Sequence, residues 1–209
     1  MHVLASIATI AFTFAAAMPA SAANIVELWD QVKAPPVPKL SPVTVKTSDT
    51  ALLVLDIQDS GCNEKRRPRC VAAVPAMAAF LQKARSARMP VFHSTAGSAT
   101  RKNILPPVAP NDDEPIVSAS VNKFHGTKLD ELLKARNIKT VIVCGTAAFG
   151  AVLHTATAAA AHGYKIVLPV DCVPGGSLYE EQMGVWGLIE GPGTVNAVTA
   201  TSLDAIKIE

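Results

Sequence analysis

The chain has 209 residues, a formal net charge of +2, and 49% hydrophobic but only 5% aromatic residues. This near-balanced charge, without a long basic run, argues against a nucleic-acid partner. The length and the hydrophobic content fit one globular domain with a sizeable core.

The N-terminus carries a pattern typical of a secretory signal. An apolar run at 3–17 is followed by Pro19 and the small residues 20–22, which is the order expected before a cleavage site. The run is shorter than the ~20 residues that span a bilayer comfortably, which favours cleavage over an uncleaved anchor. We therefore expect residues 1–22 to be a signal peptide. The mature protein is then periplasmic or secreted, with no membrane contact after cleavage.

Residues 23–50 are rich in proline at their centre and predict an extended arm, preceded by a short helix at 25–32. Such an arm has no obvious core of its own. We expect it to lie across the domain or across a partner subunit.

Residues 51–209 are expected to form one α/β domain, in which apolar runs of strand length alternate with segments of helical spacing. The predicted strands are 51–56, 90–94, 116–121, 138–144, 164–170 and 197–201, and the predicted helices are 71–88, 127–136, 150–161 and 180–189. Alternation of this kind predicts a three-layer, doubly wound, mainly parallel sheet with helices on both faces. The long polar loop at 95–115 is expected to be a site wall or a contact arm.

The four cysteines fall into two pairs along the chain. Cys62 and Cys70 flank the loop GCNEKRRPRC, and a disulfide between them is plausible in an oxidising compartment. Cys144 and Cys172 lie at or near strand ends and are expected to be small buried hydrophobic residues. The basic residues of the loop are expected to form a solvated surface patch; they are Lys65, Arg66, Arg67 and Arg69.

The most informative stretch is VIVCGTAAFGAVLHTATAAAAHGY at 141–164. A β-branched run ends at Gly145, a turn of small residues follows, and an Ala-rich helix then ends at Gly163. Turns between a strand and a helix are where open α/β sheets bind their ligands. The N–H groups of residues 148–151, at the start of the helix, suit an oxyanion or another anion.

This stretch resembles the signature of the isochorismatase-like cysteine hydrolases, which reads strand, Gly-(Val/Thr)-Ala, three variable residues, catalytic Cys, Val, then Thr-Ala and Gly-Tyr. Ala151 stands at the position of the nucleophilic cysteine. The matching residues are Gly145, Thr146, Ala147, Val152, Thr155, Ala156, Gly163 and Tyr164. The resemblance covers about 51–173. It implies the same three-layer fold, a small-molecule substrate and a homo-oligomer.

The resemblance also implies roles for two charged residues. Asp56 follows the first buried strand and begins the D-x-Q pattern Asp56-Ile57-Gln58, in which the family aspartate is the general base. Lys123 corresponds to the family lysine beside that aspartate, where it favours the ionised carboxyl group. An exposed, solvated lysine remains the alternative, because Lys123 directly precedes Phe124 whereas the common pattern separates them.

The same comparison implies that the Thr146–Ala147 peptide bond is cis. Some family members hold zinc through a D-x-H element, which VFHSTAGS at 91–98 lacks, so we expect no metal and no cofactor. We expect the substrate to contact Thr146, Ala147, Phe149, Gly150 and His154.

With Ala151 in place, the family's thioester cannot form there, and the nucleophile stays open. Cys144 is one alternative nucleophile and Thr146 another. A water activated by Asp56 or His154 is a third possibility, although His154 also fits a packed or surface histidine.

Two functions follow as hypotheses. The first is an exported hydrolase of a small amide or related C–N bond that works without the family cysteine. The second is a non-catalytic descendant that binds a small metabolite or serves as an assembly module.

Overall fold

The computed structural model describes residues 22–209, so nearly all of the predicted signal peptide lies outside the described residues. The chain divides into a unit that ends at Pro36 and a unit spanning Val37–Glu209, each described here by itself. In the first unit, a single 3₁₀ turn (η1, Trp29–Gln31) stands where a helix over 25–32 was expected. Asn24 caps the preceding turn by accepting hydrogen bonds from the N–H groups of Val26 and Glu27.

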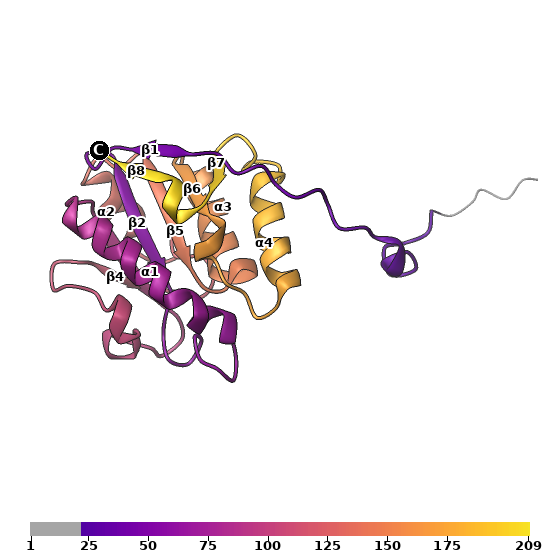
Figure 1. Ribbon diagram of the computed structural model, residues 1–209, viewed down its shortest axis with the longest axis horizontal. Coiled ribbons are helices and arrows are strands. Elements are labelled where there is room, and N and C mark those ends of the chain that lie inside the picture. Colours follow the sequence, from indigo (N-terminus) through magenta and orange to yellow (C-terminus); the bar gives the residue numbers. More distant parts are fainter. Residues whose placement is uncertain (1–21) are drawn as a thin grey trace, which may run out of the picture. The chain divides into compact units, whose positions relative to one another are not determined.

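The second unit is built on a six-stranded sheet in the order β4-β3-β2-β5-β6-β7, in which every neighbouring pair is parallel (Figure 1). The strands are β2 (Thr50–Leu55), β3 (Val91–Thr95), β4 (Ile116–Ser118), β5 (Thr140–Gly145), β6 (Lys165–Pro169) and β7 (Val198–Thr201). The six predicted strands are confirmed. Only the third is clearly shorter than expected, because the chain leaves the sheet after Ser118.

A second, two-stranded parallel sheet was not anticipated. It pairs β1 (Val43–Val45) with β8 (Ile206–Ile208), the last strand of the chain. Part of the segment expected to be a Pro-rich arm is therefore a strand.

Side chains alternate between two cores, one on each face of the large sheet. Leu52 and Val54 of β2 pack in the cluster that contains α1 (Pro68–Ser86), which crosses one face of the sheet (Figure 1). Leu53 and Leu55 pack in the cluster on the other face. That cluster contains α2 (Leu129–Lys134), α3 (Leu153–Ala161) and α4 (Leu178–Ile189). The three-layer, doubly wound fold is thus confirmed, and coverage of both faces explains why the strands read as continuous apolar runs.

The sheet order reverses direction between β2 and β5, which are neighbours although two strands separate them in sequence. Gly145 ends β5 with a φ of +145°, and a Cβ built on it would lie 2.2 Å from the carbonyl oxygen of Leu55. Only glycine permits this approach. The carboxyl ends of β2 and β5 therefore meet at a topological switch point, where open α/β sheets form their ligand crevice.

The loop between β3 and β4 contains two 3₁₀ turns, Arg101–Asn103 and Pro106–Val108, and is tied down by the buried carboxylate of Glu114. Arg85 of α1 donates to both oxygens of Glu114, at 2.8 and 2.7 Å. The Nε2 atom of His93 lies 3.0 Å from the same carboxylate. Glu114 therefore joins this long loop to α1 and β3.

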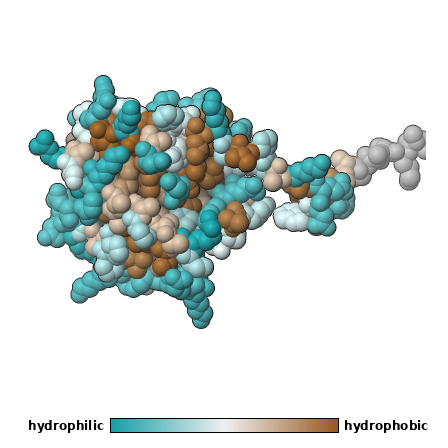
Figure 2. Space-filling model, in the orientation of Figure 1, coloured by the Kyte–Doolittle hydropathy of each residue, from teal (hydrophilic) through white to brown (hydrophobic). Residues whose placement is uncertain are grey.

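The surface seen in Figure 2 is largely hydrophilic, with hydrophobic residues in separate patches. On α4, Leu178, Tyr179 and Trp186 are 67%, 60% and 44% exposed. Aromatic residues of this kind are enriched at interfaces, but the expected homo-oligomer stays a prediction. Within residues 22–209, none of the helices has the length and apolar character needed to cross a membrane.

Because His93 is buried, we predict that the free energy of unfolding depends on pH. Burial lowers the pKa of His93 to about 4, with Glu114 opposing the shift. Between pH 6.5 and 4 the unfolded chain then binds more protons than the folded chain, so the free energy of unfolding decreases as the pH falls. We expect a loss of about 2 kcal/mol between pH 7 and pH 5. Urea unfolding of the wild type and of His93→Gln measures it, and an equal loss in the variant would contradict the assignment.

Candidate active site

A cavity of about 550 Å³ opens at the carboxyl ends of the strands. Its walls come from the segments that follow β2, β3, β4 and β5. They include Asp56, Gln58, Ser60, Gly61, Arg66, Arg67, Ala96, Gly97, residues 118–121, Thr146, Ala147, Gly150 and Ala151. The cavity therefore lies at the switch point between β2 and β5.

Asp56 follows β2 directly and adopts a φ of +55°, an uncommon conformation for a residue other than glycine. Its carboxylate is buried at the cavity wall. Oδ1 accepts a hydrogen bond from Ser94 Oγ at 2.7 Å, and Oδ2 lies 2.8 Å from Lys123 Nζ. Backbone strain of this kind clusters at functional sites. Ser94, whose role the sequence did not suggest, lies at the end of the neighbouring strand β3.

Lys123 is completely buried, so the alternative of an exposed, solvated lysine is wrong. Besides Asp56, its ammonium group contacts the carbonyl oxygens of Thr95, Ala119 and Ser120, at 3.2, 2.8 and 2.6 Å. Its backbone N–H donates to Thr155 Oγ1 on α3. The carboxylate and the carbonyl oxygens together supply the partners that a buried ammonium group requires.

The two charged groups alter each other's protonation. Burial raises the pKa of the Asp56 carboxyl group, with Lys123, Ser94 and Arg67 acting in the opposite direction. Burial lowers the pKa of the Lys123 ammonium group, and Asp56 opposes this shift. A carboxylate of increased proton affinity at a cavity wall has the property needed in a general base.

The turn after β5, the strand next to β2, forms another part of the wall. Thr146 donates its N–H to the Leu55 carbonyl and its hydroxyl to Pro174 O, at 2.9 and 3.0 Å. The Thr146–Ala147 bond is cis, as the resemblance implied. A π-helical turn over Ala148–Val152 then leads into α3, so the predicted helix over 150–161 begins with an irregular turn.

Not all N–H groups of this turn are free, contrary to expectation. The N–H of Ala148 donates to Pro174 O at 3.1 Å, and that of Gly150 donates to Ala147 O at 2.8 Å. Ala151 is only 4% exposed and lines the cavity. Residue 151 thus presents a methyl group to the cavity.

Cys144 cannot be the replacement nucleophile, because it is bonded to Cys172 with a Cα–Cα distance of 5.0 Å. The expectation that both are simply buried hydrophobic residues was incomplete for the same reason. The plausible bridge between Cys62 and Cys70 is confirmed. All four cysteines of the chain therefore form disulfides.

Two of the five predicted substrate contacts do not reach the cavity. Phe149 is 47% exposed and His154 is exposed on α3, and neither lines the cavity wall. Thr146, Ala147 and Gly150 do line the cavity.

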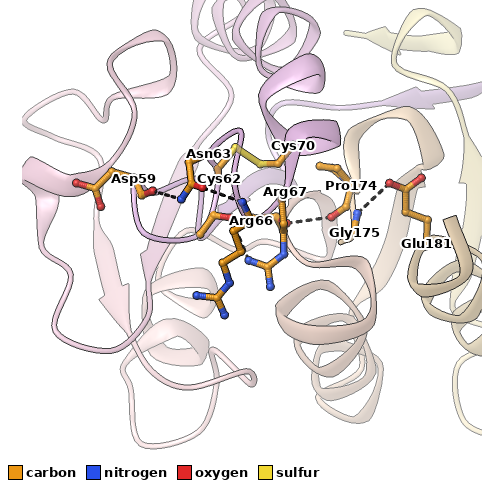
Figure 3. The surroundings of a disulfide bond; sticks show 11 residues. Asp59, Cys62, Asn63, Arg66, Arg67, Cys70, Pro174, Gly175 and Glu181 are labelled. Atoms are coloured by element: carbon orange, nitrogen blue, oxygen red, sulfur yellow. Dashed lines mark hydrogen bonds between the residues drawn. A yellow bond between two sulfur atoms is a disulfide. The ribbon is translucent and has the colours of Figure 1, made fainter. Parts of the chain in front are cut away.

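The expectation for the basic loop was incomplete. Lys65, Arg66 and Arg69 are exposed, as a solvated patch requires, but Arg66 and Arg67 also line the cavity. Arg69 makes a two-pronged ion pair with Glu181 on α4, at 2.6 Å for each bond. Figure 3 shows both cavity arginines projecting from the same side of the loop that Cys62 and Cys70 close. In the sequence, the only indication of this placement was that both arginines lie between Cys62 and Cys70.

Metal-ligating side chains do not cluster in the part of the chain that the structure describes. Within residues 22–209 no three or more His, Cys, Asp or Glu side chains converge in a way that could hold a metal ion.

Comparison with known proteins identifies the family. The pattern of the isochorismatase domain family matches residues 50–202, so the chain belongs to this family of hydrolases of small molecules. A protein of Verticillium dahliae named "Secreted isochorismatase effector Isc1" is 26% identical over 144 residues, covering 63% of this chain and 76% of that protein.

Solved structures show the same fold at low sequence identity. An isochorismatase-like hydrolase from Alkaliphilus metalliredigens matches with a TM-score of 0.68 at 22% identity, covering 76% of this chain and 96% of that one. A cysteine hydrolase from Pseudomonas syringae pv. phaseolicola 1448A matches with a TM-score of 0.69 at 21% identity, covering 81% of this chain and 95% of that one.

We predict that removing one member of the buried Asp56–Lys123 pair greatly lowers the stability of the fold. Lys123→Met leaves the Asp56 carboxylate buried without its counter-charge, and we expect a decrease of about 3 kcal/mol in the free energy of unfolding. Lys134→Met is the matched control, because it breaks an exposed pair with Asp130 that contributes about 0.5 kcal/mol or less. Urea unfolding measures both.

The double variant Asp56→Asn with Lys123→Met tests whether the two groups act as a pair. We expect it to lose less stability than the sum of the two single variants, since neither charge remains unpaired. Simple addition of the two losses would contradict the coupling.

Proposed function

We propose that the protein is an exported hydrolase of a small amide or related C–N bond, in which Asp56 activates a water molecule where relatives with the family cysteine use a thiol. The observation that carries this proposal is the buried Asp56–Lys123 pair at the wall of a cavity that Ala151 also lines. The shared cavity supports the assignment of Asp56 as a general base for attack near the position that the resemblance gives to the family nucleophile.

The chemistry balances without a covalent intermediate. Asp56 takes a proton from water as the water oxygen adds to the amide carbonyl carbon. The negative charge that develops on the carbonyl oxygen is stabilised by N–H donors of the turn, for which we assign Ala151. The intermediate collapses as the C–N bond breaks, and Asp56 returns the proton to the leaving nitrogen. The products are a carboxylic acid and ammonia or an amine. The methyl group of Ala151 leaves more room for this water than a cysteine side chain would.

A non-catalytic descendant that binds a small metabolite or serves as an assembly module is the second candidate. It is favoured by Ala151 and by the engagement of every cysteine in a disulfide, which together remove the thiol chemistry of the family. The same cavity would then bind its ligand without cleaving it.

Export to the periplasm or the medium has three independent supports. The N-terminal pattern at 1–22 is that of a signal peptide. The two disulfides are stable in oxidising compartments and rare in the cytosol. The relative from Verticillium dahliae is named as secreted.

Hydrolysis by the mature protein of a panel of small primary amides and carbamoyl compounds tests the first candidate. We expect Asp56→Asn to lower kcat/KM at least ~100-fold, within the range that general-base catalysis contributes. Asp59→Asn, an exposed change in the same loop, should retain activity. Because burial raises the pKa of Asp56 above 3.8, the acid limb of the pH–rate profile should lie above that value. Folded protein without turnover on any compound would favour the binding descendant.

Ala151→Cys tests whether a thiol at residue 151 is accessible from the cavity and can act as a nucleophile there. We expect the introduced thiol to react with iodoacetamide in the folded protein, and amide hydrolysis to increase about tenfold or more, because a positioned thiol is intrinsically a strong nucleophile. Thr157→Cys, on an exposed part of α3, provides a reference thiol that should label without changing hydrolysis. Peptide mass spectrometry locates the labels. Protection of the introduced thiol together with unchanged hydrolysis would contradict the assigned geometry.

A further inference from the structure

The cavity wall carries more positive charge than the Asp56–Lys123 pair accounts for. Asp56, Arg66 and Arg67 are the charged side chains that line it, and the Asp56 charge is already matched by Lys123 at 2.8 Å. Two guanidinium groups therefore remain on the wall, with no carboxylate of that wall left to neutralise them.

Two acidic residues of α4 interact with this loop, and both have other partners. Glu181 is held in the two-pronged ion pair with Arg69. Glu180 accepts the N–H of Gly176 at 2.7 Å, and its charge acts on Arg67 only at a distance. Counting the Glu180 charge against the two guanidinium groups leaves a net charge of about +1 for a ligand to balance.

The hydrogen-bonding capacity of both arginines is also largely unused. Arg67 donates from Nη1 to Gly61 O at 3.1 Å, and its buried Nε has no hydrogen-bond partner in the described chain. Arg66 donates from Nη1 to Ser60 O at 3.3 Å. A guanidinium group carries five N–H donors in a planar fork, which matches a planar carboxylate in two-pronged fashion.

The loop that carries these arginines is fixed before any ligand binds. Cys62 and Cys70 close it, the ion pair of Arg69 joins it to α4, and the Asn63 side chain bonds both Asp59 O and the N–H of Arg66, at 2.7 and 2.9 Å. Figure 3 shows the disulfide and the Asn63 contacts beside the two cavity arginines. Preorganised donors lose little conformational entropy on binding.

We infer that Arg66 and Arg67 bind a carboxylate on the substrate, at the end remote from the C–N bond that is hydrolysed. The inference rests on the proposed function and names its substrate class: small monoamides that carry a single carboxylate. A monoanion balances the net charge of the wall, whereas a phosphate dianion would exceed it and meet the Asp56 carboxylate.

The test compares binding of two matched series by isothermal titration calorimetry. One series is the monoamides of three- to six-carbon dicarboxylic acids, such as succinamate. The other carries methyl in place of carboxylate, such as butanamide. We expect at least one carboxylate compound to bind the mature protein about tenfold or more tightly than its neutral partner. Arg66→Gln and Arg67→Gln should each remove most of this preference.

Lys65→Gln is the control, since it removes one positive charge from the same loop without touching the cavity wall. Arg66→Lys keeps the charge but not the fork, and we expect it to restore the preference only in part. Thermal unfolding confirms that each variant is folded; Arg66 is exposed, so its replacement leaves the core intact.

Equal binding of the two series by the wild type would overturn the inference, as would an equal loss of preference in Lys65→Gln. The binding readout separates this inference from the hydrolase proposal. Selective binding of a carboxylate compound without turnover would sustain the inference and count against the hydrolase. Turnover of neutral amides that neither arginine variant affects would support the hydrolase proposal and overturn the inference.

Discussion

The buried ammonium group of Lys123 fixes the geometry on which the site depends. An ammonium group removed from water is tolerated only when its donors are satisfied, and these partners come from the carboxylate after β2, the last residue of β3 and the loop after β4. One group therefore holds the ends of three neighbouring strands together. Thr155 adds α3 through the backbone N–H of the same residue.

The turn after β5, which forms another part of the cavity wall, is positioned by close packing. Gly145 lets the end of β5 approach Leu55, and Gly184 lets α4 approach the turn, since a Cβ on it would lie 2.5 Å from the Ala148 carbonyl oxygen. These contacts position the turn independently of the chemistry of residue 151. The cavity can therefore form around a methyl group at residue 151, which is a condition of both proposed functions.

The two disulfides stiffen the segments around this cavity. Cys144–Cys172 joins the end of β5 to the segment after β6, and Cys62–Cys70 closes the loop that presents Arg66 and Arg67. Cross-links of this kind restrict the unfolded chain and thereby stabilise the fold. With every cysteine bonded, the covalent role of sulfur in this protein is structural.

The sequence by itself determined the layered fold, because continuous apolar runs and helical spacing record burial directly. It also pointed to Asp56 and to the turn at Ala151, since both follow predicted strands. Only the tertiary structure decided what depends on register and loop path. It buried Lys123 despite the shortened spacing to Phe124, paired Cys144 with Cys172 across adjacent strands, and turned Phe149 and His154 outward. It also showed that two arginines of the expected surface patch line the cavity. The physical reason is that hydrophobic pattern reports which residues are buried, whereas partners far apart in sequence are chosen by strand order and turn geometry.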